Sequence, residues 1–173
     1  LAEAAFREGH EVVWMPSYGA EKRGGTVWCD VIVSDEVIGA LFTTHPTAAV
    51  AMNPASLAKL EPMVRCGGLL VVNQSLVPEK VRRTDIRAIY IPANDLASGL
   101  GNDAVSNLIM LGALLAGCPV VAMSGISTTM GEMLSKNKER LAMNEQALGK
   151  GYHWTREYFD LPENKREEDA CVQ

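Results

Sequence analysis

The residues best suited to chemistry lie in one segment, residues 16–26, where glycines and alternating charges stand between two apolar stretches. Arg23 supplies a fork of N–H donors that suits a phosphate or a carboxylate, and Glu21 is close enough in sequence to orient it. Gly24 and Gly25 permit backbone angles and close approaches that other residues do not. The segment predicts an anion-binding loop. The alternative is an exposed loop whose charges only face water.

Cysteine and histidine spacing predicts no metal centre. The sequence contains four cysteines, Cys29, Cys66, Cys118 and Cys171, and three histidines, His10, His45 and His153. No two cysteines form a CxxC pair, so neither a zinc site nor a four-cysteine cluster is indicated. No two histidines are spaced to share one helical face. We expect buried or incidental thiols, without disulfides.

Composition and charge exclude several classes of function. The 173 residues suit one ordinary domain, and 47% of them are apolar, which allows a sizeable core. The net charge of −5 is spread along the chain, so neither nucleic acid nor an anionic membrane surface is an expected partner. No apolar run approaches the roughly 20 residues of a spanning helix, and no signal peptide is evident. We expect a cytoplasmic protein.

The N-terminal third predicts a helix followed by extended segments. Residues 1–9 form a helix that ends at a glycine, and residues 11–16 form a strand, which together make half of a βαβ unit. The strand and turn that would complete the unit are expected upstream and are missing here. Residues 28–33 are apolar and β-branched, and a turn at 34–36 precedes Val37 and Ile38. The pattern predicts an antiparallel strand pair at this point.

The middle of the chain predicts a parallel sheet. Residues 48–52 lead to Asn53 and Pro54, a cap and first position for a helix that runs to about Val64. Residues 69–72 and 88–91 are short, wholly apolar strands with polar residues after them. Strands of this kind are typical of a sheet covered on both faces. The predicted fold is α/β and Rossmann-like, mostly parallel, with helices on both faces and one antiparallel pair.

The C-terminal half predicts helices. Asn102 caps the clearest one, which ends at Gly117 and Pro119. A last short strand over residues 120–122 and two further helices follow, the second of which is expected to end before Gly149 and Gly151. Residues 1–155 are therefore predicted to form the domain, and residues 156–173 a charged tail.

Open parallel sheets bind ligands beyond the carboxyl ends of their strands. The loops expected there contain the polar residues Ser17, Tyr18, Asn53, Asn73, Gln74, Ser75 and Asn94. For each asparagine, the alternative is an ordinary helix cap or turn residue.

Three motifs resemble one known family. Residues 17–26, followed by residues 29–36, closely resemble the gamma subunits of 2-oxoacid:ferredoxin oxidoreductases. Residues 91–112, with the Ile-Pro-Ala-Asn and Leu-Gly-Asn runs, and residues 144–151 match further along in the family's order. The resemblance covers roughly residues 1–151. Family members also begin with a strand and a glycine-rich turn, which this sequence lacks.

The resemblance implies a part of a larger enzyme that is inactive alone. Such enzymes decarboxylate a 2-oxoacid oxidatively, form acyl-coenzyme A and reduce ferredoxin. It implies that thiamine diphosphate, magnesium and 4Fe-4S clusters sit on alpha and beta partner subunits, with a delta subunit as a further candidate, and that this chain holds no cofactor. No residue is expected to be catalytic. The positions implied to lie near coenzyme A or at a subunit interface are Ser17, Tyr18, Glu21, Arg23, Gly24, Gly25, Asn94 and Asn102.

The sequence leaves alternatives for the substrate and for the class of protein. Ser17 and Tyr18 with residues 23–26 look closer to the 2-oxoglutarate and branched-chain types than to the pyruvate type, so 2-oxoglutarate is favoured. Branched-chain, pyruvate and indolepyruvate types are the alternatives. A freestanding dinucleotide-binding enzyme would need a GxGxxG turn with an acidic residue after the next strand, which is absent. A purely structural partner subunit is the remaining possibility.

Overall fold

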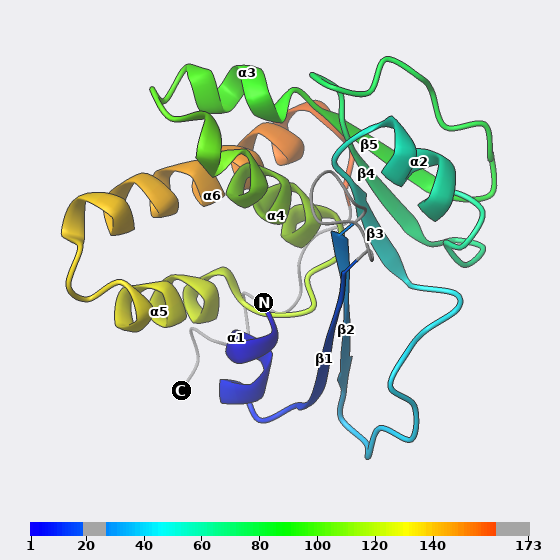
Figure 1. Cartoon of the computed structure of the whole chain (residues 1–173), viewed down its shortest axis with the longest axis horizontal. Helices are drawn as coiled ribbons and strands as arrows, with labels where there is room; N and C mark the ends of the chain where they lie inside the picture. The colour runs from blue at the N-terminus through cyan, green and yellow to red at the C-terminus, as the bar shows by residue number, and fades with distance from the viewer. Residues whose placement is uncertain (19–26, 162–173) are drawn as a thin grey trace.

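The computed structural model describes residues 1–18 and 27–161. Within them the chain runs from α1 to α6, and Figure 1 shows a helical layer on one side of a small sheet and α2 on the other. The elements are α1 (Ala2–Arg7), β1 (Glu11–Tyr18), β2 (Val27–Ser34), β3 (Ala48–Ala51), α2 (Pro54–Leu60), β4 (Leu69–Asn73), β5 (Arg87–Ile91), α3 (Ala93–Ser98), the 3-10 turn η1 (Asp103–Val105), α4 (Ser106–Gly117), α5 (Met123–Met133) and α6 (Lys138–Tyr158).

Three parallel strands form the central sheet in the order β3-β4-β5. All five residues of β4 are buried, because successive side chains enter cores on opposite faces of the sheet. Leu69 and Val71 pack with α4 and α6 residues, whereas Leu70 and Val72 pack with α2. The predicted α/β fold, with helices on both faces, is confirmed.

The antiparallel pair is confirmed, but its predicted partner strand is wrong. β2 pairs along its whole length with β1, from Glu11 opposite Ser34 to Tyr18 opposite Val27, and we call this pair the ribbon. Val37 and Ile38 form no strand, and Val37 is exposed. Two residues offer too short a ladder, whereas β1, the preceding strand, offers eight paired positions.

The helix α1 is terminated at a glycine, as the sequence predicted. Gly9 has φ of 91°, its N–H donates to Phe6 O at 3.1 Å, and the N–H of His10 donates to Ala5 O at 3.2 Å. These two bonds satisfy carbonyls that the helix leaves open. They also turn the chain sharply into β1.

The predicted strand at residues 120–122 is wrong. These residues connect α4 to α5, and Val121 is buried against α1 rather than paired in a sheet. The N–H of Ala122 donates to a carboxylate oxygen of Glu8 at 3.1 Å. The apolar residues of this segment therefore pack against helices. The hydrogen bond from Ala122 to Glu8 joins the end of α1 to the start of α5.

Two predicted helix ends are also wrong. α2 ends at Leu60 rather than near Val64 and continues as turns. α6 continues through Gly149 and Gly151 to Tyr158. Gly151 serves close packing, because a Cβ built there would lie 2.0 Å from Ile109 O on α4. The division into residues 1–155 and a tail stays a prediction, and α6 spans that boundary.

The connection from β4 to β5 is held by Arg83. Its guanidinium donates to the carbonyls of Glu61 and Val64 after α2 and to the carboxylate of Asp85. The hydrogen bond from Arg83 lowers the pKa of Asp85 to about 2. The connection is thereby tied to the helix that covers the sheet.

Candidate functional site

The carboxyl ends of the three parallel strands meet at one edge, and Asn73 joins them. Its side chain is fully buried. Asn73 Nδ2 donates to Asn94 Oδ1 at 2.8 Å and lies 3.5 Å from Met52 O. Because Met52 follows β3 and Asn94 follows β5, one amide at the end of β4 links all three strand ends.

A second bridge lies beside the first and is exposed. Ser75 Oγ donates to Asp95 Oδ2 at 2.9 Å, and the backbone N–H of Asp95 lies 3.3 Å from Ser75 Oγ. The N–H of Gln74 donates to Ile91 O at 2.9 Å, which extends the ladder past the strands. The edge is therefore a fixed polar rim made of the loops after β4 and β5.

The side-chain oxygen of Asn73 is unusual as a buried hydrogen-bond acceptor. Among the described residues, Asn73 Oδ1 is one of two buried side-chain polar atoms without a hydrogen-bond partner, and Thr155 Oγ1 is the other. Burying an amide oxygen without a donor costs free energy. The sequence correctly predicts Asn73 at the carboxyl edge of the sheet. It does not indicate that Asn73 would be the buried residue of the rim.

Two of the other asparagines serve as caps. Asn53 Oδ1 accepts from the N–H of Ser56 at 2.8 Å at the start of α2. Asn102 Oδ1 accepts from the N–H of Ala104 at 3.1 Å at the start of η1. The predicted cap role of Asn53 is confirmed. Asn102 caps η1 rather than the predicted helix itself, because α4 begins at Ser106 with Val105 as its N-cap. The expected place of Asn102 in a coenzyme A or interface site stays a prediction.

The predicted loop residues are only partly described. Ser17 and Tyr18 were expected in a loop after a strand, but both belong to β1, because they pair with Trp28 and Val27 in the ribbon. Trp28 in turn lies under the ammonium of Lys59 on α2, which is 3.0 Å from the ring centroid. Ser17 is thus next to the α2 side of the molecule. The predicted site residues outside the described part are Glu21, Arg23, Gly24 and Gly25.

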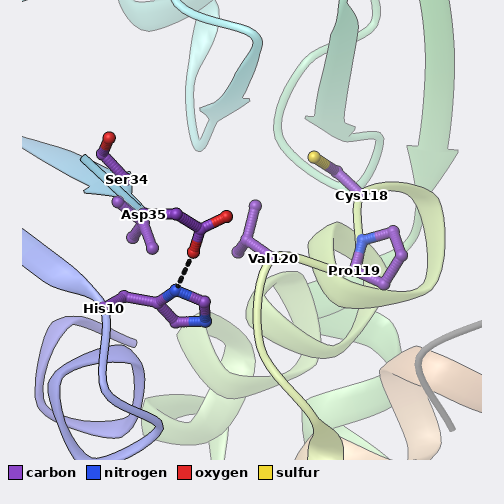
Figure 2. A pocket seen from close by; sticks show the side chains of 7 residues that line it. His10, Ser34, Asp35, Cys118, Pro119 and Val120 are labelled. Carbon is purple, nitrogen blue, oxygen red and sulfur yellow. Dashed lines mark hydrogen bonds and ion pairs between the residues drawn. The ribbon is translucent and has the colours of Figure 1, made fainter. Parts of the chain in front are cut away.

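The structure contains a pocket beside the ribbon that the sequence did not predict. It has a volume of about 170 Å³ and is lined by His10, Val33, Ser34, Asp35, Cys118, Pro119 and Val120. His10 Nδ1 lies 2.6 Å from Asp35 Oδ1, and Figure 2 shows this pair at one side of the pocket. No sequence signal could have found the pair, since 25 positions separate its members.

The chemistry of this pocket is limited by its geometry. A carboxylate orients an imidazole for proton transfer only when a nucleophile or substrate faces the other ring nitrogen. In Figure 2, Val120 lies between His10 and Cys118, and the sulfur is not directed at the imidazole. The pair therefore acts as a cross-link between the start of β1 and the residue after β2, and no nucleophilic dyad is present there.

The described residues offer no site for a metal ion or cluster. Residues 1–18 and 27–161 contain no group of three or more His, Cys, Asp or Glu side chains arranged to hold one. In the same part of the chain, no helix is both long and apolar enough to cross a membrane.

The family model and the known relatives agree on one family for this chain. The family model described as pyruvate ferredoxin/flavodoxin oxidoreductase matches residues 1–154. Ketoisovalerate oxidoreductase subunit VorA of Methanothermobacter marburgensis is 37% identical over 116 residues, which are 67% of this chain and 24% of VorA. 2-Oxoglutarate synthase subunit KorC of Methanocaldococcus jannaschii is 30% identical over 156 residues, which are 89% of this chain and 82% of KorC.

Coverage differs among these relatives. The chain spans a quarter of the length of that VorA and a third of the length of VorA from Methanothermobacter thermautotrophicus. Among solved structures, the gamma subunit of a keto/oxoacid ferredoxin oxidoreductase from Geobacter sulfurreducens aligns with a TM-score of 0.75 and 26% identity, over 90% of this chain and 87% of that one. The resemblance predicted from the motifs is confirmed, and the chain belongs to the pyruvate ferredoxin/flavodoxin oxidoreductase family.

Proposed function

We propose that this chain is the gamma-type part of a cytoplasmic 2-oxoacid:ferredoxin oxidoreductase and works only in the assembled enzyme. The family match over residues 1–154 carries the proposal, and the fold shared with the Geobacter gamma subunit supports it. The assembled enzyme decarboxylates a 2-oxoacid, releases carbon dioxide, forms a thioester with coenzyme A and passes two electrons to ferredoxin.

The proposed cofactors belong to the partners. Thiamine diphosphate, magnesium and 4Fe-4S clusters are assigned to alpha and beta subunits, with a delta subunit as a further candidate. The described residues do not fit a magnesium ion or a cluster, because they contain no grouped set of ligands. We therefore assign no step on these groups to this chain.

The proposed task of this chain is to shape the approach of coenzyme A. Asn94 at the carboxyl edge and Asn102 before η1 both have their side-chain oxygens engaged within the chain, Asn94 by Asn73 and Asn102 by Ala104. Each therefore offers its amide nitrogen as a donor to a phosphate or amide of the ligand. Ser17 and Tyr18 at the end of β1 lead directly into the segment with Glu21, Arg23, Gly24 and Gly25.

Arg23→Ala should raise the Michaelis constant for coenzyme A by at least about tenfold in the assembled enzyme, because one charge-assisted hydrogen bond contributes about 1.5–3 kcal/mol. Subunit composition should not change. Arg82→Ala, which removes an exposed arginine from the β4–β5 connection, is the matched control and should leave the constant unchanged. Normal coenzyme A dependence in a fully assembled Arg23 variant would contradict the proposed role.

The proposed substrate is 2-oxoglutarate. Ketoisovalerate is the second candidate, because the VorA relative has the higher identity, 37% against 30% for KorC. The test is coenzyme A-dependent reduction of a viologen dye by the purified complex with 2-oxoglutarate, ketoisovalerate, pyruvate and indolepyruvate in turn. We expect the highest kcat/KM with 2-oxoglutarate. A clear preference for ketoisovalerate would replace the first assignment with the second.

A further inference from the structure

We propose that one apolar face of the ribbon is the surface on which the remaining polypeptide of the same oxidoreductase packs. The inference rests on the proposed function and adds to it a contact surface and the chemistry of that contact. Neither the family match nor the relatives' names specify such a surface.

The pairing register defines this face. Directly opposite residues in an antiparallel pair share a face, as do every second residues along a strand. The residues on the face are Val12, Trp14, Pro16 and Tyr18 from β1 and Val27, Cys29, Val31 and Val33 from β2. We call these residues the ribbon face. They include no Asp, Glu, Lys, Arg or His, although a fifth of the chain is charged.

Within residues 1–18 and 27–161, other elements cover only one end of the ribbon face. Val12 and Val33 pack against the cluster formed by α1 and the helices beyond it, and Figure 1 shows α1 beside the end of the ribbon where β1 begins. Toward the other end, Trp14 is 59% exposed, Tyr18 73% and Val27 66%. The apolar face thus continues past its cover into solvent.

The opposite face of the ribbon differs because it carries charged and polar residues. It carries Glu11, Asp30 and Ser34 together with apolar residues, and its Trp28 is held by Lys59 of α2. A two-stranded ribbon with an uncovered apolar face is only marginally stable in water. The difference between the two faces points to an apolar partner for the ribbon face alone.

The relatives favour another polypeptide of the same enzyme over a second copy of this chain as the occupant. Trp14, Tyr18 and Val27 together expose on the order of 400 Å². A stable interface buries about 800 Å² on each partner, so the contact extends beyond these three side chains. The length of the relatives points to the kind of partner. In the two VorA proteins the matching region is a quarter and a third of one longer chain, which holds further polypeptide beside it.

Exposed tryptophan and tyrosine on an uncharged surface are typical of the residues that dominate binding at an interface. The ribbon face also ends at Tyr18 and Val27, the residues on either side of the segment proposed to serve coenzyme A.

The test uses Cys29, which is exposed and belongs to the ribbon face, as its probe. The assembled enzyme and the full chain expressed without partners are treated with a maleimide, and labelling is followed by mass spectrometry. Cys29 should react at least about tenfold more slowly in the assembled enzyme, because thiol reactivity depends on access. Cys66, which is exposed between α2 and β4, is the internal reference for reagent activity.

A second variant pair tests the contact energetically. Trp14→Glu should weaken association with the partner polypeptide at least about thirtyfold, whereas Trp14→Phe should retain most of it. Met133→Glu changes a still more exposed apolar residue at the end of α5 and should have no effect. Circular dichroism of each purified chain establishes that the variants fold.

The outcomes separate this inference from the proposed function. An active, 2-oxoacid-dependent enzyme in which Cys29 reacts as fast as in the chain alone would overturn the inference and leave the function standing. Protection of Cys29 in the chain alone, with a dimer on size-exclusion chromatography, would also overturn it in favour of a second copy. If no assembled, active enzyme is obtained, the proposed function fails and this inference fails with it.

Discussion

Gly151→Ala is expected to lower the free energy of unfolding by about 3 kcal/mol or more, because it forces apart the close contact between α4 and α6. A Cβ at Gly151 would lie 2.0 Å from Ile109 O and 2.7 Å from Ile109 C. Both atoms belong to the backbone of α4, so no side-chain rotation relieves the clash. The reciprocal contact is equally close, since a Cβ at Gly112 on α4 would lie 2.1 Å from Leu148 O on α6.

The same helix contains a matched control. Gly149 has nothing within 4 Å of a built Cβ. Alanine is the better helix former by about 1 kcal/mol, so Gly149→Ala should raise stability by up to that amount. Urea unfolding followed by circular dichroism measures both variants. Equal stability of the two variants would show that the α4–α6 contact is not as close as described.

Asn73→Asp is expected to cost about 3 kcal/mol at pH 8, because it places a carboxylate at a fully buried position. The buried amide now donates to Asn94 Oδ1. A carboxylate has no hydrogen to donate, so the link between the ends of β4 and β5 is lost as well. Asn53→Asp is the control, since Asn53 is an exposed helix cap and Asp caps equally well.

The loss of stability caused by Asn73→Asp should depend on pH. The direction of that dependence identifies burial of the carboxylate as the cause. Burial raises the pKa of an aspartate above its unfolded value of about 3.9. The folded variant then binds more protons than the unfolded one, so its stability falls as pH rises from about 4 through the raised pKa. The deficit relative to the wild type should therefore be smaller at pH 5 than at pH 8. A deficit that is the same at both pH values would contradict burial as the cause.

Local patterns predicted the parallel part of this fold well. Strands 69–72 and 88–91, the caps Asn53 and Asn102, and the glycine stop after α1 were predictable because each depends on neighbouring residues. The same reasoning placed Asn73 and Asn94 at one edge, since parallel strands bring their carboxyl ends together. The structure shows these two side chains in contact.

The errors arise where pairing and packing between elements decide the outcome. β2 pairs with β1 rather than with Val37 and Ile38, and the cluster of His10 with Asp35 follows from that pairing. Gly151 looked like a helix end, because a glycine reads locally as a stop. Its role is set by Ile109 on another helix, which no local pattern contains.

The central claim is that the enzyme needs this chain for a 2-oxoacid- and coenzyme A-dependent reaction. The most direct measurement is viologen reduction by the enzyme purified from cells with and without this chain, with partner subunits identified in each preparation. We predict that the tagged chain co-purifies with thiamine diphosphate-containing partners and that activity is lost without it. A stable monomer without partners, together with undiminished activity in the cells that lack the chain, would contradict the claim and favour a freestanding binding module.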